Sequence, residues 1–322
     1  MSSVRNLLRA VVLFGLSIGL IVPGTGVRAA PSVSELTQQI NKSSAELERI
    51  VESYNRLNEE IKTTRAAVAK LGQRIGPLEQ QLAQARSEVG RLAVTAYKTG
   101  RLRTADILLS PGKTDDLAGR LGALDQLARE REKQIADFDQ AQRRYVAEKA
   151  QLESALARQT AQARQLAAGK KKIEADLAKL YELRRRAYGS ATSTSTGTAY
   201  RGSIPAVAGS AGAAVRFAYG AIGKPYVWAA DGPNGYDCSG LTLAAWRAAG
   251  RSLPHNAAMQ WERVAHIGRS ALQPGDLVFY RNLGHVALYV GDGKVIHAPT
   301  FGEHVKLSSV DMMKPYGYGR VR

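Results

Sequence analysis

A long repeat of apolar residues constrains the fold of this chain more than any other feature. From Leu36 to Ala96 the mostly apolar core positions recur at alternating spacings of three and four, and the positions between them are rich in Glu, Gln, Lys and Arg. A repeat of this kind places an apolar seam along a helix and is typical of a coiled coil. Pro77 lies inside the series, so we expect a kink or an interruption of the helix there.

A second seam runs from Leu117 to Leu180 and is less pure, since residues such as Arg131 and Lys149 occupy core positions. The sequence therefore predicts an all-α coiled-coil region over residues 32–188, with a break at 99–116. Two long helices joined by a break can fold back as an antiparallel hairpin or pair between two chains. The sequence does not distinguish these arrangements.

The break itself carries an apolar patch, Ile107, Leu108 and Leu109, beside the turn-forming Ser110-Pro111-Gly112. A hairpin tip needs a turn but not three consecutive exposed apolar residues, and such a patch indicates a docking site for a partner. The alternative is that short helices here pack back on the coiled coil.

Residues 1–29 have the features of a secretory signal peptide. Arg5 and Arg9 precede an apolar run from Ala10 to Val22, and Val27-Arg28-Ala29 offers small residues for cleavage. The run is short for a membrane span, although an uncleaved anchor is the alternative. We expect the protein to be secreted and to act in the cell wall or elsewhere outside the cytoplasm.

The charge of the chain limits the classes of partner that we expect it to bind. Lys and Arg number 45 against 28 Asp and Glu, which gives a formal net charge of +17. A basic exported chain suits an anionic surface such as wall polymers or lipid headgroups. Nucleic acid is not expected, because the export signal argues against it and the sequence contains no nucleic-acid-binding motif.

Residues 189–205 form a predicted flexible linker, because the stretch GSATSTSTGTAYRGS is small, polar and nearly uncharged. Residues 206–322 then form a separate domain that is large enough for its own core. Its pattern of a few helices followed by short strands predicts an α+β fold.

This domain contains the only cysteine of the chain, Cys238, so no intrachain disulfide is possible. Cys238 directly precedes an apolar run that ends at Gly250, which predicts a short helix with the thiol at its N-terminus. The positive end of a helix favours a thiolate and is expected to lower the pKa of the thiol. The alternative is a buried structural cysteine.

Two histidines, His285 in GHVALYV and His297 in KVIHAP, lie in strand-like segments. A thiolate nucleophile needs an imidazole as base and a third group that orients the imidazole. A three-residue loop, Gly291 to Gly293, would pair Ala287 with His297 and place both histidines on one face of the sheet. We therefore predict this odd-length loop, with Gly293 in the left-handed region.

The segments KPYVWAADGPNGYDCSGLT, LQPGDLVFY and GHVALYVGDGKVIHAP closely resemble the NlpC/p60 family of cell-wall cysteine peptidases. The resemblance covers residues 206–322 and implies a papain-like α+β domain. It also implies a nucleophile at Cys238, a general base at His285 and an orienting group at His297. The family's typical substrates are peptidoglycan stem peptides, commonly cleaved between γ-D-glutamate and diaminopimelate.

The resemblance also gives roles to neighbouring residues. Tyr226, Asp237 and Ser239 match family positions that line the substrate cleft; a core tyrosine, a cap aspartate and a helix-start serine are the structural alternatives. His255, His266 and His304 are expected at the surface. No metal or cofactor is expected, because the chain has no paired cysteines and no His-Glu-x-x-His spacing.

The overall layout of signal peptide, two coiled-coil arms, linker and catalytic domain is similar to that of septal hydrolases related to PcsB. This similarity implies that the coiled coil docks on the FtsEX division complex, with Ile107, Leu108 and Leu109 as contacts. The leading interpretation is a secreted peptidoglycan endopeptidase that acts in cell division. The alternatives are a non-catalytic wall-binding or hydrolase-activating protein, and an amidase or acyltransferase on another substrate.

Overall fold

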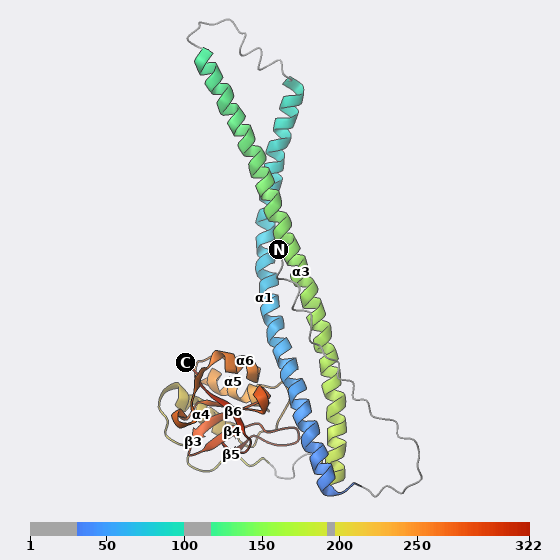
Figure 1. The fold of residues 1–322 in the computed structure, drawn as a ribbon, viewed down its shortest axis with the longest axis vertical. Coiled ribbons are helices and arrows are strands. Elements are labelled where there is room, and N and C mark those ends of the chain that lie inside the picture. The colour runs from blue at the N-terminus through green and yellow to red at the C-terminus, as the bar shows by residue number, and fades with distance from the viewer. Residues whose placement is uncertain (1–30, 100–116, 192–196) are drawn as a thin grey trace, which may run out of the picture.

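The structure is a computed structural model that describes residues 31–99, 117–191 and 197–322. It consists of a long helical hairpin and a smaller α+β domain beside the base of the hairpin (Figure 1). The predicted signal peptide and the apolar patch Ile107 to Leu109 lie outside the described residues.

The hairpin consists of α1 (Val33–Thr99) and α3 (Leu117–Tyr188), which pack against each other within one chain. Of the two arrangements that the sequence allows, the structure has the antiparallel hairpin within one chain. Near the base, the predicted seam is buried through residues such as Leu36, Ile40 and Leu180. α1 runs through Pro77 without a break, so the expected interruption is wrong and the alternative, a kink, stays a prediction. A proline removes one helical hydrogen bond, and packing on α3 stabilises the turns around it.

The helices of the hairpin separate toward the far end, where several large apolar side chains are exposed (Figure 1). None of the helices in the described ranges has both the length and the apolar character that crossing a membrane requires.

The C-terminal domain contains three helices, α4 (Gly209–Ala221), α5 (Cys238–Ala248) and α6 (Ala257–Arg263). Its antiparallel sheet has the order β1-β6-β2-β3-β4-β5. The strands are β1 (Ala265–Ile267), β2 (Leu277–Tyr280), β3 (His285–Gly291), β4 (Lys294–His297), β5 (Lys306–Ser309) and β6 (Pro315–Arg320). Short 3₁₀ turns, η2 (Arg269–Ala271) and η3 (Arg281–Leu283), precede β2 and β3.

This architecture confirms the predicted α+β class. Two short edge strands, β1 and β5, were missed. α6 ends at Arg263, and the chain turns directly into β1. Edge strands this short are difficult to recognise because they bury little and show no clear alternation of apolar residues.

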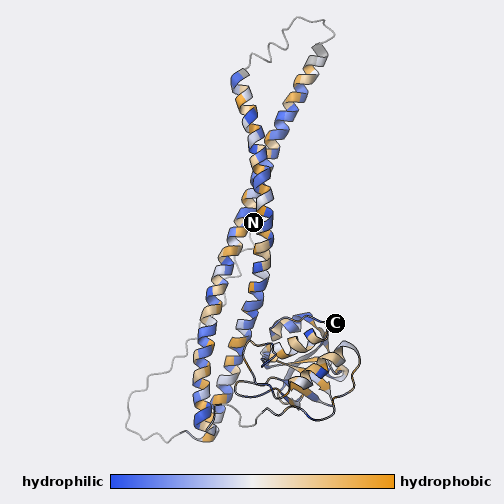
Figure 2. Ribbon diagram, turned by 180° about the vertical axis from the view of Figure 1, so that it is seen from behind, coloured by the Kyte–Doolittle hydropathy of each residue, from blue (hydrophilic) through white to orange (hydrophobic). Residues whose placement is uncertain are grey.

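The central strands are buried on both faces. One face contributes residues such as Phe279, Leu288 and Ile296 to a large core that also contains α4 and α5. The opposite face forms a second, smaller cluster around Tyr280 and Val295. The large core continues without interruption into the base of the hairpin. Figure 2 shows the apolar colouring of the central strands and helices in the domain.

The β3–β4 hairpin has the predicted register. Leu288 pairs with Ile296 and Tyr289 with Val295, which continues to Ala287 opposite His297. The predicted three-residue loop was wrong, because Gly291 pairs with Lys294 and leaves the two-residue turn Asp292-Gly293. A bulge between Tyr289 and Gly291 supplies the odd residue instead, and Gly293 has the predicted positive φ of 65°. The odd number of residues matters because a shift by one would turn one histidine to the other face.

Candidate active site

Cys238 begins α5, as the sequence predicts, and the residue before it fixes the helix start. The Asp237 carboxylate accepts a 2.7 Å hydrogen bond from the Gly240 N–H and so caps the helix. The cap sets the position of the thiol at the helix N-terminus. Cys238 itself is only 2% exposed.

The two histidines lie within hydrogen-bonding distance of each other. His285 Nε2 is 3.0 Å from His297 Nδ1, and His297 Nε2 is 3.0 Å from the Ser308 hydroxyl on β5. The hydrogen bonds therefore run in a line from β3 through β4 to β5. They leave Nδ1 of His285 as the nitrogen available for proton transfer, and this buried atom has no hydrogen-bond partner in the described part of the chain.

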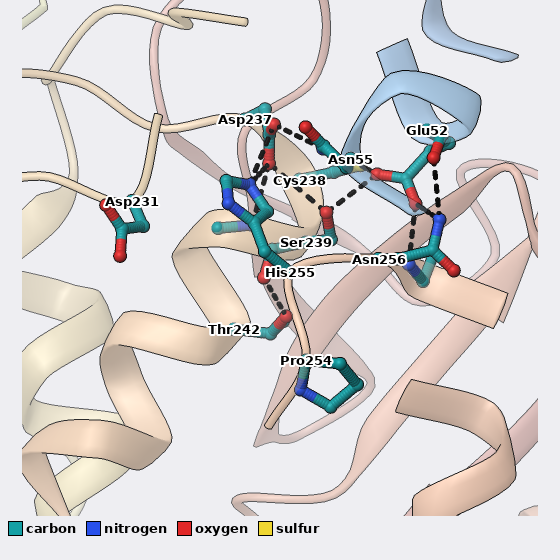
Figure 3. A network of polar contacts seen from close by, with 12 residues as sticks. Glu52, Asn55, Asp231, Asp237, Cys238, Ser239, Thr242, Pro254, His255 and Asn256 are labelled. Atoms are coloured by element: carbon teal, nitrogen blue, oxygen red, sulfur yellow. Dashed lines mark hydrogen bonds and ion pairs between the residues drawn. The ribbon is translucent and has the colours of Figure 1, made fainter. Parts of the chain in front are cut away.

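The thiol of Cys238 forms no hydrogen bond with this free nitrogen. Its partner is Glu52 of α1, whose Oε1 lies 3.7 Å from Sγ. The same oxygen accepts a 2.7 Å hydrogen bond from the Ser239 hydroxyl. Figure 3 shows the Glu52 side chain reaching from α1 into the network around Cys238 and Ser239. A side chain of the coiled coil thus takes the place beside the nucleophile.

The other oxygen of Glu52 is also bound. Oε2 accepts hydrogen bonds from the Asn256 side-chain amide at 2.9 Å and from the Ala257 main-chain N–H at 2.6 Å. Asn256 donates a second bond, 2.8 Å long, to the main-chain carbonyl of Glu52. The carboxyl group is thus surrounded by donors of the catalytic domain.

A second carboxyl group lies one helical turn away on α1. Glu48 is 1% exposed, forms an ion pair with Arg281 and has Oε2 at 3.7 Å from Nδ1 of His285. Beside it, a cavity of about 230 Å³ remains between α1 and β4, lined among others by Ser44 and His297. The two carboxyl groups therefore cover the nucleophile and the free face of the imidazole.

Further contacts fix α1 over the site. The Asn55 side chain donates a 2.9 Å hydrogen bond to Asp237. The rings of Tyr54 and Trp228 meet edge to face with centroids 5.4 Å apart. The covered surface therefore extends over two turns of α1.

The pKa of the Cys238 thiol is raised well above its ordinary value, so the predicted lowering was wrong. Burial is the largest cause, and the negative charges of Glu52 and Asp237 act in the same direction. The N-terminus of α5 favours a thiolate, but burial of the thiol and the neighbouring carboxyl groups outweigh this effect on its pKa. The closed chain therefore holds a protonated, unreactive thiol.

The other groups of the site also titrate away from their ordinary values. Burial lowers the pKa of His285 well below its usual range and that of His297 to about 3, so both imidazoles are neutral. Burial raises the pKa of Glu48 to about 7 and, together with the charge of Asp237, that of Glu52 to about 7. Covering the site thus favours the uncharged forms of all four side chains.

His255 was expected at the surface and is instead buried, with 7% of its surface exposed. Its Nε2 lies 2.8 Å and 2.9 Å from the two carboxylate oxygens of Asp237. Burial alone would lower the pKa of His255, but the Asp237 charge outweighs it and the net shift is upward. The expectation holds for His266, which is exposed, whereas His304 is half-buried.

The predicted substrate-binding residues lie around the thiol. Ser239 and Asp237 belong to the network described above, and Tyr226 is buried, with its ring 4.8 Å from that of Phe301. Burial and the charge of Asp237 raise the pKa of Tyr226 well above its ordinary value. Tyr226 and Asp237 therefore also fill the structural roles that were their alternatives. The Ser239 hydroxyl does not cap the helix backbone, because it donates to the carboxylates of Glu52 and Asp237.

The structure brings together one group that resembles a metal site. Ligand atoms of Glu52, Asp237 and Cys238 lie within 4.8 Å of one another. The oxygens of both carboxyl groups already accept hydrogen bonds, from Asn256 and His255 among others. The cluster is therefore explained by the contact between α1 and the domain.

Sequence reasoning missed Glu48, Glu52 and Ser308. The two glutamates are spaced by four residues on the polar side of a coiled coil, where glutamate ordinarily faces solvent. Ser308 lies on the missed strand β5. No local signal marks either feature, because each depends on a contact between segments far apart in the sequence.

Comparison with known proteins shows which family the C-terminal domain is similar to. Residues 223–319 match the family model described as NlpC/P60 family. A protein from Mycobacterium bovis named as a probable endopeptidase is 40% identical over 108 residues, which cover 32% of this chain and 27% of that protein. A protein from Corynebacterium glutamicum with the same designation is 43% identical over 93 residues, or 29% of this chain and 44% of its own length. This chain thus spans less than half of either relative.

Among solved structures, the NlpC/p60 domain of the peptidoglycan hydrolase SagA is 37% identical to this chain. The match covers 34% of this chain and 98% of that domain, with a TM-score of 0.33. These comparisons concern the C-terminal domain, and the long helices of the hairpin are outside the segment that the family model matches.

Proposed function

We propose, from the premise that the C-terminal domain is an NlpC/P60 domain, that this chain is a cysteine endopeptidase that cleaves the stem peptides of peptidoglycan. The observation that carries the proposal is the line of hydrogen bonds from His285 through His297, set near the only cysteine of the chain. A cysteine at a helix start and two linked imidazoles are the parts that thiol-mediated acyl transfer requires.

Each residue has a role in this reaction. Nδ1 of His285 takes the proton of the Cys238 thiol, and the thiolate attacks the amide carbon of the substrate. The main-chain N–H of Cys238 is a suitable donor to the oxyanion. His285 then gives the proton to the leaving amine, and water hydrolyses the thioester with His285 again acting as the base. His297 holds the tautomer and orientation of His285 throughout.

This chemistry requires α1 to leave the site. In the closed chain the thiol lies against Glu52 and Glu48 lies against His285, and Nδ1 of His285 has no hydrogen bond to the thiol. We therefore propose that the closed chain is inactive and that movement of α1 joins Cys238 to His285. The coiled coil acts as the regulatory part of the protein.

The finer assignments extend the same proposal. The substrate bond is that between γ-D-glutamate and diaminopimelate, and Tyr226, Asp237 and Ser239 bind polar groups of the stem peptide. The protein is secreted through the segment 1–29 and acts in the cell wall during division and wall remodelling. The FtsEX complex, contacting Ile107, Leu108 and Leu109, is the partner that would move α1.

Mass spectrometry of the products from diaminopimelate-type peptidoglycan tests the function. The full chain carrying Glu48→Ala and Glu52→Ala serves as the opened enzyme, and the same chain with Cys238→Ala added is the control. Release of fragments ending in D-glutamate that disappears in the control supports the proposal. Unchanged products in the control would mean that Cys238 is not the nucleophile, and an absence of products from the opened enzyme would contradict an endopeptidase.

A further inference from the structure

His255 is a buried titratable side chain that takes no part in the proton transfers between Cys238 and His285. Its Nε2 lies 2.8 Å and 2.9 Å from the two carboxylate oxygens of Asp237, and 7% of the residue is exposed. A carboxylate only accepts hydrogen bonds, so Nε2 carries a proton in both the neutral and the charged imidazole. Titration of His255 therefore takes place at Nδ1 and changes the charge beside the nucleophile without removing the hydrogen bond to Asp237.

Two features of the fold bring His255 to the first turn of α5. A Cβ at Gly240 would lie 2.9 Å from Nε2 of His255, so a glycine in that turn permits the close approach. The side-chain amide of Gln260, which is 0% exposed, donates 2.9 Å hydrogen bonds to the main-chain carbonyls of Pro254 and Ser239. These contacts connect the segment before α6 to α5 and fix the imidazole against the cap of that helix.

The charged groups around His255 are acidic. Burial is the largest single influence on the pKa of His255 and lowers it, but the charges of Asp237, Glu52 and Asp231 together raise it above its ordinary value. Asp231 is itself paired with Arg247 of α5 at 2.7 Å. When α1 leaves the site, Glu52 leaves with it and Asp237 remains. The charge on His255 in the open chain therefore depends mainly on its pair with Asp237.

The carboxylate of Asp237 opposes ionisation of the nucleophile unless its charge is compensated. Burial, the charge of Glu52 and the charge of Asp237, in that order, raise the pKa of the Cys238 thiol. Movement of α1 reduces the first cause and removes the second, but Asp237 stays in place because it caps α5 through the Gly240 N–H. The same movement takes away Asn55, which donates a 2.9 Å hydrogen bond to this carboxylate in the closed chain. In the open chain, the imidazolium is the cationic partner that compensates Asp237.

We propose that the His255 imidazolium is a positioning residue for the nucleophile, which holds the Asp237 carboxylate in the cap of α5 and compensates its charge, so that Cys238 ionises once α1 has left the site. The inference rests on the proposed function for the role of Cys238. The site then uses its imidazoles in opposite states, since His285 must be neutral to accept the thiol proton and His255 must be charged. The reactivity gained from His255 is present below the pKa of its imidazolium and is lost as pH rises through that pKa.

Alkylation of the only cysteine tests this role without any peptidase activity. The full chain with Glu48→Ala and Glu52→Ala is the opened chain, and its thiolate displaces iodide from iodoacetamide, an uncharged reagent, to form a thioether. His255→Gln in this background keeps an N–H donor for Asp237 but has no charge at any pH. We expect it to react at least about tenfold more slowly than the opened chain at about pH 6 and within about twofold of it at about pH 9.5.

His255→Arg in the opened chain is the conservative variant, because a guanidinium donates to a carboxylate and keeps its charge at high pH. It should recover most of the reactivity at about pH 6. His266→Gln, the same change at an exposed position of β1, should leave both rates unchanged. Equal slowing by His255→Gln at both pH values would indicate a merely structural role and overturn the inference, as would a His255→Arg chain as slow as His255→Gln. Urea unfolding shows that each variant is folded, and His255→Asn, a second uncharged donor, replaces His255→Gln where that chain is not.

Peptide cleavage separates this inference from the proposed function. The opened chain and its His255→Gln and His255→Arg variants are compared by kcat/KM on one γ-D-glutamyl peptide at the same two pH values. A loss of at least about tenfold at the lower pH in His255→Gln that His255→Arg recovers supports the inference. Cleavage that His255→Gln leaves unchanged would overturn the positioning role and leave the endopeptidase standing. No cleavage by any chain, with the alkylation difference present, would refute the endopeptidase and leave the positioning role standing.

Discussion

The two buried faces of α1 differ in chemistry and in what they bind. One face packs on α3 through apolar residues such as Leu36, Ile40 and Leu47. The other carries buried polar residues, Ser44, Glu48, Glu52 and Asn55, of which the last three contact the catalytic domain. Burial of an apolar side chain is favourable by itself, whereas a buried carboxyl group must be compensated by hydrogen bonds or charges.

The two faces of α1 therefore have different functions. The apolar face holds the hairpin together through buried side chains. The two buried carboxyl groups of the polar face contribute little net stabilisation, because their desolvation offsets the hydrogen bonds that they accept. A contact of this kind is specific in geometry and can be released by a partner. It is therefore suited to a covering element that must leave the active site.

A cavity in the apolar face should destabilise the hairpin. Leu180 on α3 is 1% exposed, and Leu180→Ala should destabilise the chain by about 2 to 5 kcal/mol, measured by urea unfolding. Ile135→Ala is the matched control in the far part of the hairpin, where the side chain is 52% exposed, and its effect should stay within about 0.5 kcal/mol. Equal losses from both variants would contradict a seam that is packed only near the base.

The polar face should respond to pH through Glu52, whose pKa is raised from 4.5 to about 7 in the folded chain. A raised pKa means that the folded state favours the protonated form, so stability is lost as pH rises from 4.5 to 7. Relative to Glu52→Gln, which has no charge to bury, the wild-type chain should lose up to about 1.4 kcal/mol per pH unit in this window. Parallel pH curves of unfolding free energy for the two chains would refute the shift.

Removing both carboxyl groups of the polar face should uncover the active site. Glu48→Ala with Glu52→Ala should raise the rate of peptide cleavage by at least about tenfold, because the thiol and His285 lose the carboxyl groups that cover them. Glu46→Ala with Glu60→Ala removes two glutamates from exposed positions of the same helix and should leave the rate unchanged. An equal increase in both pairs would point to general loosening of α1.

The smallest effect concerns the line of hydrogen bonds behind the nucleophile. In the opened chain, Ser308→Ala should lower kcat about three- to tenfold with little change in KM, since it removes one hydrogen bond of about 1 kcal/mol from His297. Ser308→Thr retains the hydroxyl and should recover much of the rate. Ser309→Ala, at an exposed neighbouring position, serves as the control, and a loss of the same size there would count against the role of Ser308.

Much of this molecule follows from local patterns. The seam of α1, the helix start at Cys238 and the register that aligns His285 with His297 each depend on residues close together in the sequence. Periodicity and turn chemistry are sufficient for features of this kind. The likeness to NlpC/p60 domains rests separately on the resemblance of three short segments.

The covering of the active site by α1 could not be predicted in the same way. The cover depends on contacts between Glu52 and residues about 190 to 205 positions later in the chain, such as Cys238 and Ala257. A glutamate on the polar side of a coiled coil carries no sign that it is buried. For the same reason, the pKa of Cys238 was expected to be low, and burial of His255 was not foreseen.

The rate at which N-ethylmaleimide modifies Cys238 in the native full chain tests the central claim most directly, because this is the only thiol. If α1 covers the site, modification should be at least about 100-fold slower than in the chain unfolded in urea, and Glu48→Ala with Glu52→Ala should remove most of that protection. Modification of the native wild-type chain at the unfolded rate would show an open thiol and contradict the covered active site.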